Sequence, residues 1–166
     1  MILRPERAQD ATAIGALTEA AFSGQPYSDR TEHLIVDRLR RAGVLSLSLV
    51  AEDDGALVGH IAFSPVALSG SEKDWYGLGP VSVIPGRQGE GIGGALIRRG
   101  LEDLRGLGAA GCIVVGNPAL YRKFGFVSQQ ALLLSDVPAE YFLVQAFTGP
   151  VPAGAAEFHP GFYRDV

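Results

Sequence analysis

The stretch of this sequence best suited to chemistry is Gly86-Arg87-Gln88-Gly89-Glu90-Gly91-Ile92-Gly93-Gly94. Five of its nine residues are glycine, which is more than a tight turn needs, so no side chains shield the backbone N–H groups. Where such a turn leads into a helix, the free N–H groups and the helix dipole favour a phosphate. The run therefore predicts a pyrophosphate-binding loop, in which Arg87 and Gln88 either contact phosphate or are simply solvated.

Two common phosphate motifs fit this run poorly. A P-loop needs a lysine after its glycines, and none follows here. Gly89-x-Gly91-x-x-Gly94 satisfies the dinucleotide fingerprint, but a Rossmann site also has an acidic residue about 20 positions later. Residues 109–114 carry no carboxylate, and the 72 residues after Gly94 are too few for a second mononucleotide-binding half. A dinucleotide-dependent oxidoreductase is therefore the less favoured alternative.

A third pattern in the run, Gln-x-x-Gly-x-Gly at 88–93, resembles the acyl-CoA pyrophosphate loop of the GNAT superfamily of N-acetyltransferases. Downstream, 111–116 is an apolar strand pattern, and NPALYRKFGF at 117–126 resembles the short helix of that family that carries a tyrosine, here Tyr121. Leu-Gly-Pro-Val before the loop and Gly-Asn-Pro before the tyrosine are similar to the YhbS-like bacterial branch. The resemblance covers nearly the whole chain and is strongest from 78 to 126.

The resemblance implies one acetyltransferase domain over 1–166 with the α/β (α+β) acyl-CoA N-acyltransferase fold. That fold has a mixed, mostly antiparallel sheet of about seven strands, opened into a V between 75–84 and 111–116 and flanked by about four helices. It also implies acetyl-CoA as cosubstrate, no metal, and direct transfer of the acetyl group to the amine of a small molecule or peptide. The residues it assigns to coenzyme binding are Val81, Ser82, Val83, Gln88, Gly89, Glu90, Gly91, Ile92, Gly93, Gly94, Asn117, Tyr121 and Phe124.

Making an amide from a thioester needs a neutral amine, a polarised carbonyl and a proton for the departing thiolate. Tyr121 is the predicted catalytic donor to the sulfur, because a phenol hydrogen-bonded there can protonate it. A backbone N–H near Ser82 or Val83 is predicted to support the carbonyl oxygen, and Asn117 to contact the pantetheine arm. Both side chains have simpler alternatives: Tyr121 as a core residue and Asn117 as a turn residue. A non-catalytic acyl-CoA sensor using the same loop is the other alternative function.

The base that deprotonates the amine is not legible from the sequence. Glu32 is the catalytic residue we predict, because its helix borders the expected acceptor groove, although a carboxylate there also simply suits the helix dipole. The three histidines lie on unrelated elements without metal-ligand spacing, so no metal site is predicted, and Cys112 is expected in the core. The base candidates are Glu32, His33, His60, Glu72, Asp74 and Glu140.

Two helices should precede the first hairpin. Asp10 and Thr31 are their predicted N-caps, and Leu34, Ile35 and Leu39 are the predicted buried face of the second. The central helix follows the glycine run, with apolar residues at helical spacing up to residue 104.

The strand pattern is clear along the rest of the chain. After a first strand at 2–4, residues 44–68 predict a hairpin with a turn at 53–55 and a break near Pro65. In the strand at 75–84, Gly77, Gly79 and Pro80 suggest a bulge or a close backbone approach rather than a smooth ladder. Further strands are predicted at 132–134 and 141–147, and the tail beyond residue 148 should pack through Phe158, Phe162 and Tyr163.

The composition sets limits on the partners. The chain has 166 residues, enough for one ordinary domain with its own core. Its net charge of -4 argues against nucleic acid and mildly favours a cationic amine. One cysteine cannot form an internal disulfide, the N-terminus lacks a signal-peptide pattern, and no apolar run is long enough for a membrane span. We therefore expect a cytoplasmic protein, monomeric or homodimeric.

Overall fold

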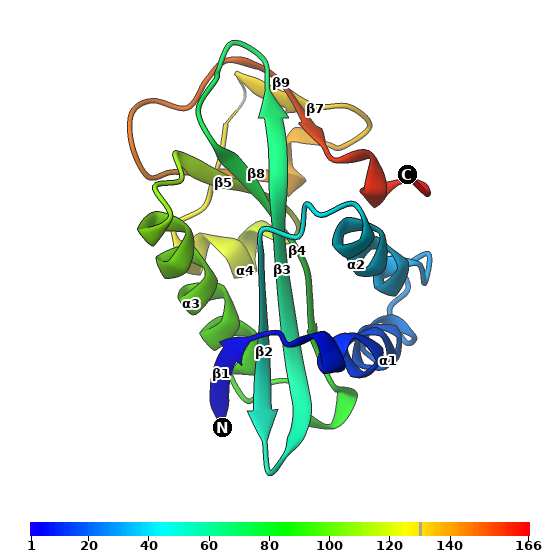
Figure 1. Ribbon diagram of the computed structural model, residues 1–166. Helices are drawn as coiled ribbons and strands as arrows, with labels where there is room; N and C mark the ends of the chain where they lie inside the picture. The colour runs from blue at the N-terminus through cyan, green and yellow to red at the C-terminus, as the bar shows by residue number, and fades with distance from the viewer. Residues whose placement is uncertain (130) are drawn as a thin grey trace.

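One sheet organises the computed structural model, which describes residues 1–129 and 131–166 (Figure 1). Four α-helices flank the sheet within these residues: α1 (Ala11–Phe22), α2 (Glu32–Arg41), α3 (Ile92–Gly106) and α4 (Pro118–Tyr121). The nine strands found there are β1 (Ile2–Pro5), β2 (Leu47–Asp53), β3 (Ala56–Leu68), β4 (Trp75–Val83), β5 (Gly111–Val115), β6 (Val127–Ser128), β7 (Leu132–Leu134), β8 (Phe142–Ala146) and β9 (Gly154–Phe158).

The sheet is mixed and mostly antiparallel, as predicted. Its order is β1-β2-β3-β4-β5-β8-β6, while β9 joins the end of β3 and carries β7 on its other side. Only the β4–β5 and β7–β9 pairs are parallel among the described strands. The sequence predicted about seven strands and missed β6 and β9. β6 is only two residues long, and β9 lies in a tail rich in proline and glycine, which disfavour strands.

Helices cover both faces of the sheet (Figure 1). On one face α3 packs its apolar stripe on β2, β3 and β4, and on the other α1 and α2 cover the strands around Val50. The predicted buried face of α2 was partly wrong, since Leu34 is exposed and Val36 is buried with Leu39. The helix is rotated relative to that prediction so that Val36 contacts the sheet.

The hairpin formed by β2 and β3 turns at Asp54 and Gly55, which both have positive φ, as the predicted tight turn requires. The predicted break near Pro65 was wrong, because β3 runs unbroken to Leu68. Phe63 accepts a hydrogen bond on the β2 side, so the main-chain atoms of Pro65 also face that side. At Pro65 the pairing of β3 with β2 has already ended, and its pairing with β9 begins only at the next residue of β3, Val66. The missing N–H of Pro65 therefore interrupts no ladder.

Asp10 and Thr31 occupy the N-cap positions of α1 and α2, as predicted, but their side-chain contacts differ from those expected of a cap. Neither Asp10 nor Thr31 caps its helix through its side chain. Asp10 instead accepts hydrogen bonds from the Arg7 N–H at 2.7 Å and the Arg4 guanidinium at 2.8 Å, and the Thr31 hydroxyl donates to Asp29 at 2.6 Å. In both cases the side chain contacts a nearby charged group rather than the N–H groups of its helix.

The tail beyond residue 148 packs as predicted for two of its three aromatic residues. Phe158 is buried and its ring centroid lies 4.8 Å from that of Phe162. Tyr163 is 62% exposed, so the prediction that it packs against the rest of the protein was wrong.

Candidate active site

The second half of β4 is an open strand edge. β4 pairs with β5 only through Trp75, Tyr76 and Gly77, and in the described part of the chain no strand continues the ladder beyond them on that side. On the other side, two residues, Gly79 and Pro80, lie opposite one residue of β3, which is the predicted bulge. The strands therefore separate at the bulge and form the V that the fold was predicted to have.

The main-chain atoms of Val81 and Val83 face this opening. The N–H of Ile84 donates to the Val58 carbonyl on β3 at 3.0 Å, and backbone groups alternate in direction along a strand. Ser82 therefore directs its main chain to β3, while its two neighbours point the other way. The Gln88 side chain agrees with this geometry, because its Nε2 donates to the Val83 carbonyl at 3.1 Å. Of the two N–H groups proposed for the carbonyl oxygen, only that of Val83 faces the opening.

A cavity of about 260 Å³ lies beside this edge. It is bounded by α1 and the segment after it, by β4, by the start of α3 and by α4. Within the described chain, none of the side chains lining it is charged. The lining residues are Ala21, Phe22, Gln25, Tyr27, Val81, Ser82, Val83, Gln88, Gly93, Gly94, Ile97 and Leu120.

The glycine run leads directly into α3, as predicted. Gly91 has φ +86° and is the N-cap. The first N–H group to make an intrahelical hydrogen bond is that of Ala95, which donates to the Gly91 carbonyl at 3.0 Å. The N–H groups of Ile92, Gly93 and Gly94 thus lie in the first turn without intrahelical acceptors. They sit at the positive end of a 15-residue helix, next to the cavity. This arrangement can hold an anion.

Arg87 does not face the cavity with a free guanidinium. Its Nε lies 2.9 Å from Glu90 and its Nη1 3.0 Å from Asp53, so it joins the glycine run to the β2–β3 turn. The Arg87 guanidinium lowers the pKa of the Asp53 carboxyl. Arg87 therefore has a structural role, and the Glu90 side chain points to it.

Tyr121 is 6% exposed and packs edge-on against Phe126, with ring centroids 5.9 Å apart. A Cβ on Gly116 would lie 2.5 Å from the Tyr121 ring, so only glycine at that position leaves room for it. Burial raises the pKa of Tyr121 to about 12, with a smaller contribution from Tyr27. The phenol stays protonated and is a permanent hydrogen-bond donor. Its neighbour Leu120 lines the cavity, whereas Tyr121 itself is not among the lining residues.

Asn117 and Phe124 lie outside the cavity. The Asn117 Oδ1 accepts from the Ala119 N–H at 2.9 Å and caps α4, which is its predicted turn role. Phe124 lies under the Arg98 guanidinium, 5.1 Å from the ring centroid, in a groove of about 470 Å³ between α3 and the turn Arg122–Phe124. Neither side chain lines the cavity, although the Phe124 ring lies beside the first turn of α3, where a Cβ on Gly94 would be 3.5 Å from it.

The base candidates are spread over the molecule. Glu32 is half-buried; its Oε1 accepts from the Ser28 hydroxyl, and its Oε2 is buried without a partner among the described residues. It does not line the cavity, although its helix follows directly on the segment of Gln25 and Tyr27 that does. Glu72, Asp74 and Glu140 are exposed side chains away from it.

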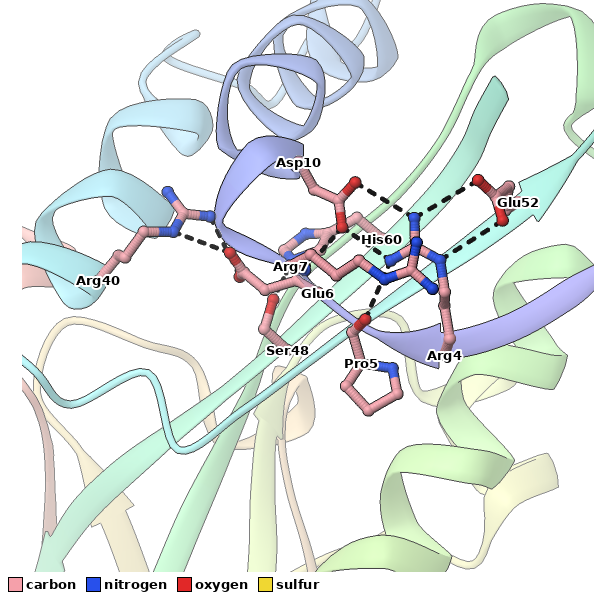
Figure 2. A network of polar contacts seen from close by, with 9 residues as sticks. All are labelled: Arg4, Pro5, Glu6, Arg7, Asp10, Arg40, Ser48, Glu52 and His60. Carbon is pink, nitrogen blue, oxygen red and sulfur yellow. Dashed lines mark hydrogen bonds and ion pairs between the residues drawn. The ribbon is translucent and has the colours of Figure 1, made fainter. Parts of the chain in front are cut away.

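His60 is the polar residue whose setting the sequence reasoning underestimated. It is fully buried, its Nε2 lies 2.8 Å from the Ser48 hydroxyl, and burial lowers its pKa to about 4. Figure 2 shows it behind a charged layer in which Arg40 pairs with Glu6 at 2.9 Å. The sequence did indicate that His60 is buried, because it stands among apolar residues in the strand LVGHIAFSPVAL.

Cys112 is a buried free thiol, and burial raises its pKa, so it is unreactive. No cluster of potential metal ligands occurs in the residues described. Over the same residues, no helix has both the length and the apolar character needed to cross a membrane.

Comparison with known proteins gives a consistent result. Residues 13–126 match the model of the acetyltransferase (GNAT) family. The chain is 40% identical over 127 residues to a protein of Escherichia coli strain K12 named uncharacterized N-acetyltransferase YhbS, an alignment covering 76% of this chain and 73% of that one.

Two solved structures cover almost the whole chain. A GNAT family acetyltransferase from Brucella melitensis, in complex with acetyl-CoA, is 53% identical, with 97% of each chain covered and a TM-score of 0.87. The YhbS protein of E. coli in complex with CoA is 32% identical, with a TM-score of 0.88 over 98% of this chain and 92% of that chain.

Proposed function

This chain belongs to the acetyltransferase (GNAT) family of acyltransferases, and from this premise we propose that it transfers the acetyl group of acetyl-CoA directly to a primary amine. The observation that best supports this proposal is the first turn of α3, whose N–H groups have no intrahelical acceptors and lie beside the open edge of β4. The complexes of the two similar proteins with acetyl-CoA and CoA support this choice of cosubstrate. We propose that residues 1–166 act as one domain, because β1 and β9 belong to the same sheet.

The glycine run is proposed to bind the pyrophosphate. The N–H groups of Ile92, Gly93 and Gly94 have no intrahelical acceptors, and the helix dipole adds positive charge where a phosphate oxygen can approach. Gly89 and Gly91 adopt positive φ, so glycine at these positions allows the turn that aims these N–H groups outward. The side chains of the run act less directly, since Gln88 and Glu90 are already hydrogen-bonded within the protein.

The open edge of β4 is proposed to hold the acyl arm. The Val83 N–H faces the opening, where it can donate to the thioester carbonyl oxygen as negative charge develops on it. The amine nitrogen attacks the carbonyl carbon, the C–N bond forms, and the C–S bond breaks to release the thiolate.

Tyr121 is proposed to donate a hydrogen bond to the departing sulfur. A phenol with a pKa of about 12 is a weaker acid than an alkyl thiol of about 8.5, so it stabilises the thiolate by hydrogen bonding rather than by complete proton transfer. Glu32 is proposed to take the amine proton through water, because its Oε2 has no partner among the described residues and its helix follows the cavity wall. We also propose a cytoplasmic setting, with which the buried free thiol of the lone cysteine is compatible.

A panel of primary amines tests this function. Each amine is incubated with the protein and acetyl-CoA, and release of CoA thiol is followed with a thiol reagent. Transfer predicts amine-dependent release and an acetylated product by mass spectrometry. Binding of acetyl-CoA without turnover of any amine would instead favour the sensor.

A further inference from the structure

Two buried side chains on β3 and β4, which do not hydrogen-bond to each other in this structure, each have a polar atom without a partner in the described chain. The Nδ1 of His60 and the Oγ of Ser82 both lack partners among the described residues, and the two residues are 0% and 2% exposed. They are directly opposite in the β3–β4 register, so their side chains lie next to each other on the face covered by α1 and α2. Leaving such atoms unpaired is costly, so this pair needs an explanation.

Ser82 also lines the 260 Å³ cavity. The wall it faces is apolar, with Ala21 and Phe22 from α1, and no lining side chain in the described chain carries a charge. The Ser82 hydroxyl, whose oxygen is closed to water in this structure, is therefore the polar side-chain group that β4 could turn toward this side of the cavity. Its oxygen has two lone pairs and can accept an amine N–H while its own hydrogen is donated elsewhere.

His60 can take that hydrogen. It is neutral at physiological pH, because burial lowers its pKa to about 4. Its Nε2 lies 2.8 Å from the Ser48 hydroxyl, and when Nε2–H donates to Ser48, Nδ1 is left as an acceptor on the Ser82 side. In that tautomer, rotation of the Ser82 hydroxyl toward Nδ1 would let His60 accept its hydrogen and leave the Ser82 lone pairs for the cavity.

We propose that the Ser82 hydroxyl binds the amino group of the acyl acceptor, that His60 is its positioning residue, and that the acceptor is a small primary amine with an uncharged, apolar body. The assignment rests on the proposed amine acetylation. No covalent bond forms or breaks at Ser82, which accepts one N–H of the amine and donates to His60 Nδ1.

Ser82→Ala and Ser64→Ala make a matched pair for the test. Ser64 is also fully buried on this face, its Oγ also lacks a partner among the described residues, but it does not line the cavity. With benzylamine or butylamine as the probe, Ser82→Ala should raise the KM for the amine about tenfold, the worth of one hydrogen bond to an amine, and leave the KM for acetyl-CoA unchanged. Ser64→Ala should match the wild type in both constants.

The role of His60 is tested by replacing one ring nitrogen at a time. An Asn side chain carries its amide atoms near the position of Nδ1, and a Gln side chain near that of Nε2. His60→Gln should therefore raise the amine KM as Ser82→Ala does, while His60→Asn should stay near the wild-type value. Combining His60→Gln with Ser82→Ala should add nothing to Ser82→Ala alone, because both remove the same contact.

Thermal unfolding of each variant checks that it is folded. An unchanged amine KM in Ser82→Ala, or the same change in Ser64→Ala, overturns the assignment while acetylation itself persists. If the wild type acetylates no amine of the panel although acetyl-CoA raises its Tm, the assignment falls together with the proposed transfer. If it acetylates other amines but neither of these two, the assignment alone is overturned. The two failures are thus distinguishable.

Discussion

Gly93→Ala separates ligand binding from folding better than any other change in the glycine run. A Cβ at Gly93 would find its nearest atom, a Val83 methyl, at 3.7 Å, which is ordinary van der Waals contact, and its φ lies outside the left-handed region. Replacing glycine by alanine inside a helix gains up to about 1 kcal/mol. Gly91 lacks this advantage, because its φ of +86° strains any other residue. The free enzyme should thus fold and melt at or slightly above the wild-type temperature.

The same substitution should weaken the binding of acetyl-CoA. The new methyl stands beside the free N–H groups of the first turn and keeps a phosphate from reaching them. Losing two charge-assisted hydrogen bonds of about 1.5 kcal/mol or more each weakens binding at least about a hundredfold. At acetyl-CoA equal to 100 times the wild-type Kd, ligand stabilisation falls from about 2.7 to about 0.4 kcal/mol. For a chain of this size, the Tm shift falls from roughly 5–11 °C to about 1–2 °C.

Differential scanning fluorimetry with and without acetyl-CoA measures both effects. Gly106→Ala is the matched control, since it lies in the same helix, has no atom within 4 Å of its added Cβ, and is far from the cavity lining. It should keep the full shift. A full shift in Gly93→Ala as well would refute the argument that bare amides at this helix end bind the diphosphate.

Other predictions concern Tyr121 and His60. Tyr121→Phe should lower kcat by about tenfold or more with a nearly unchanged Kd for acetyl-CoA, and equal turnover would remove the phenol from the reaction. Because its pKa is about 12, kcat should show no loss from Tyr121 ionisation up to pH 10; a tyrosine-dependent fall below that pH would contradict its burial. Since the pKa of His60 is lowered from 6.5 to about 4, its contribution to stability is present above pH 6.5 and lost as pH falls toward 4. Urea unfolding should therefore show about 2 kcal/mol lost between pH 7.5 and pH 5, absent in His60→Asn, and equal slopes for both would argue against a buried neutral ring.

The features predicted well from the sequence were local ones. The strand, glycine turn and helix from 81 to 104, and the hairpin turn at Asp54 and Gly55, follow from chain conformations that few other residues allow. The bulge at Gly79 and Pro80 was legible for the same reason. These are the parts where local preference and the final fold agree.

The features that were missed depend on distant partners. Pro65 continues β3 only because its missing N–H faces a gap between two other strands. Asp10 holds its expected N-cap position, but its side chain pairs with Arg4, a residue on the first strand, instead of the helix. His60 was one of several base candidates, and nothing in its local sequence showed that Ser82 would lie opposite it with a free hydroxyl. Such pairings depend on strand register, which one sequence does not reveal.

A crystal structure of this protein with acetyl-CoA tests the central claim most directly. The account predicts pyrophosphate oxygens within about 3 Å of the Ile92, Gly93 and Gly94 N–H groups, and the sulfur within hydrogen-bonding reach of the Tyr121 hydroxyl. A coenzyme bound elsewhere, with the first turn of α3 in contact only with solvent or with the protein's own side chains, would contradict it.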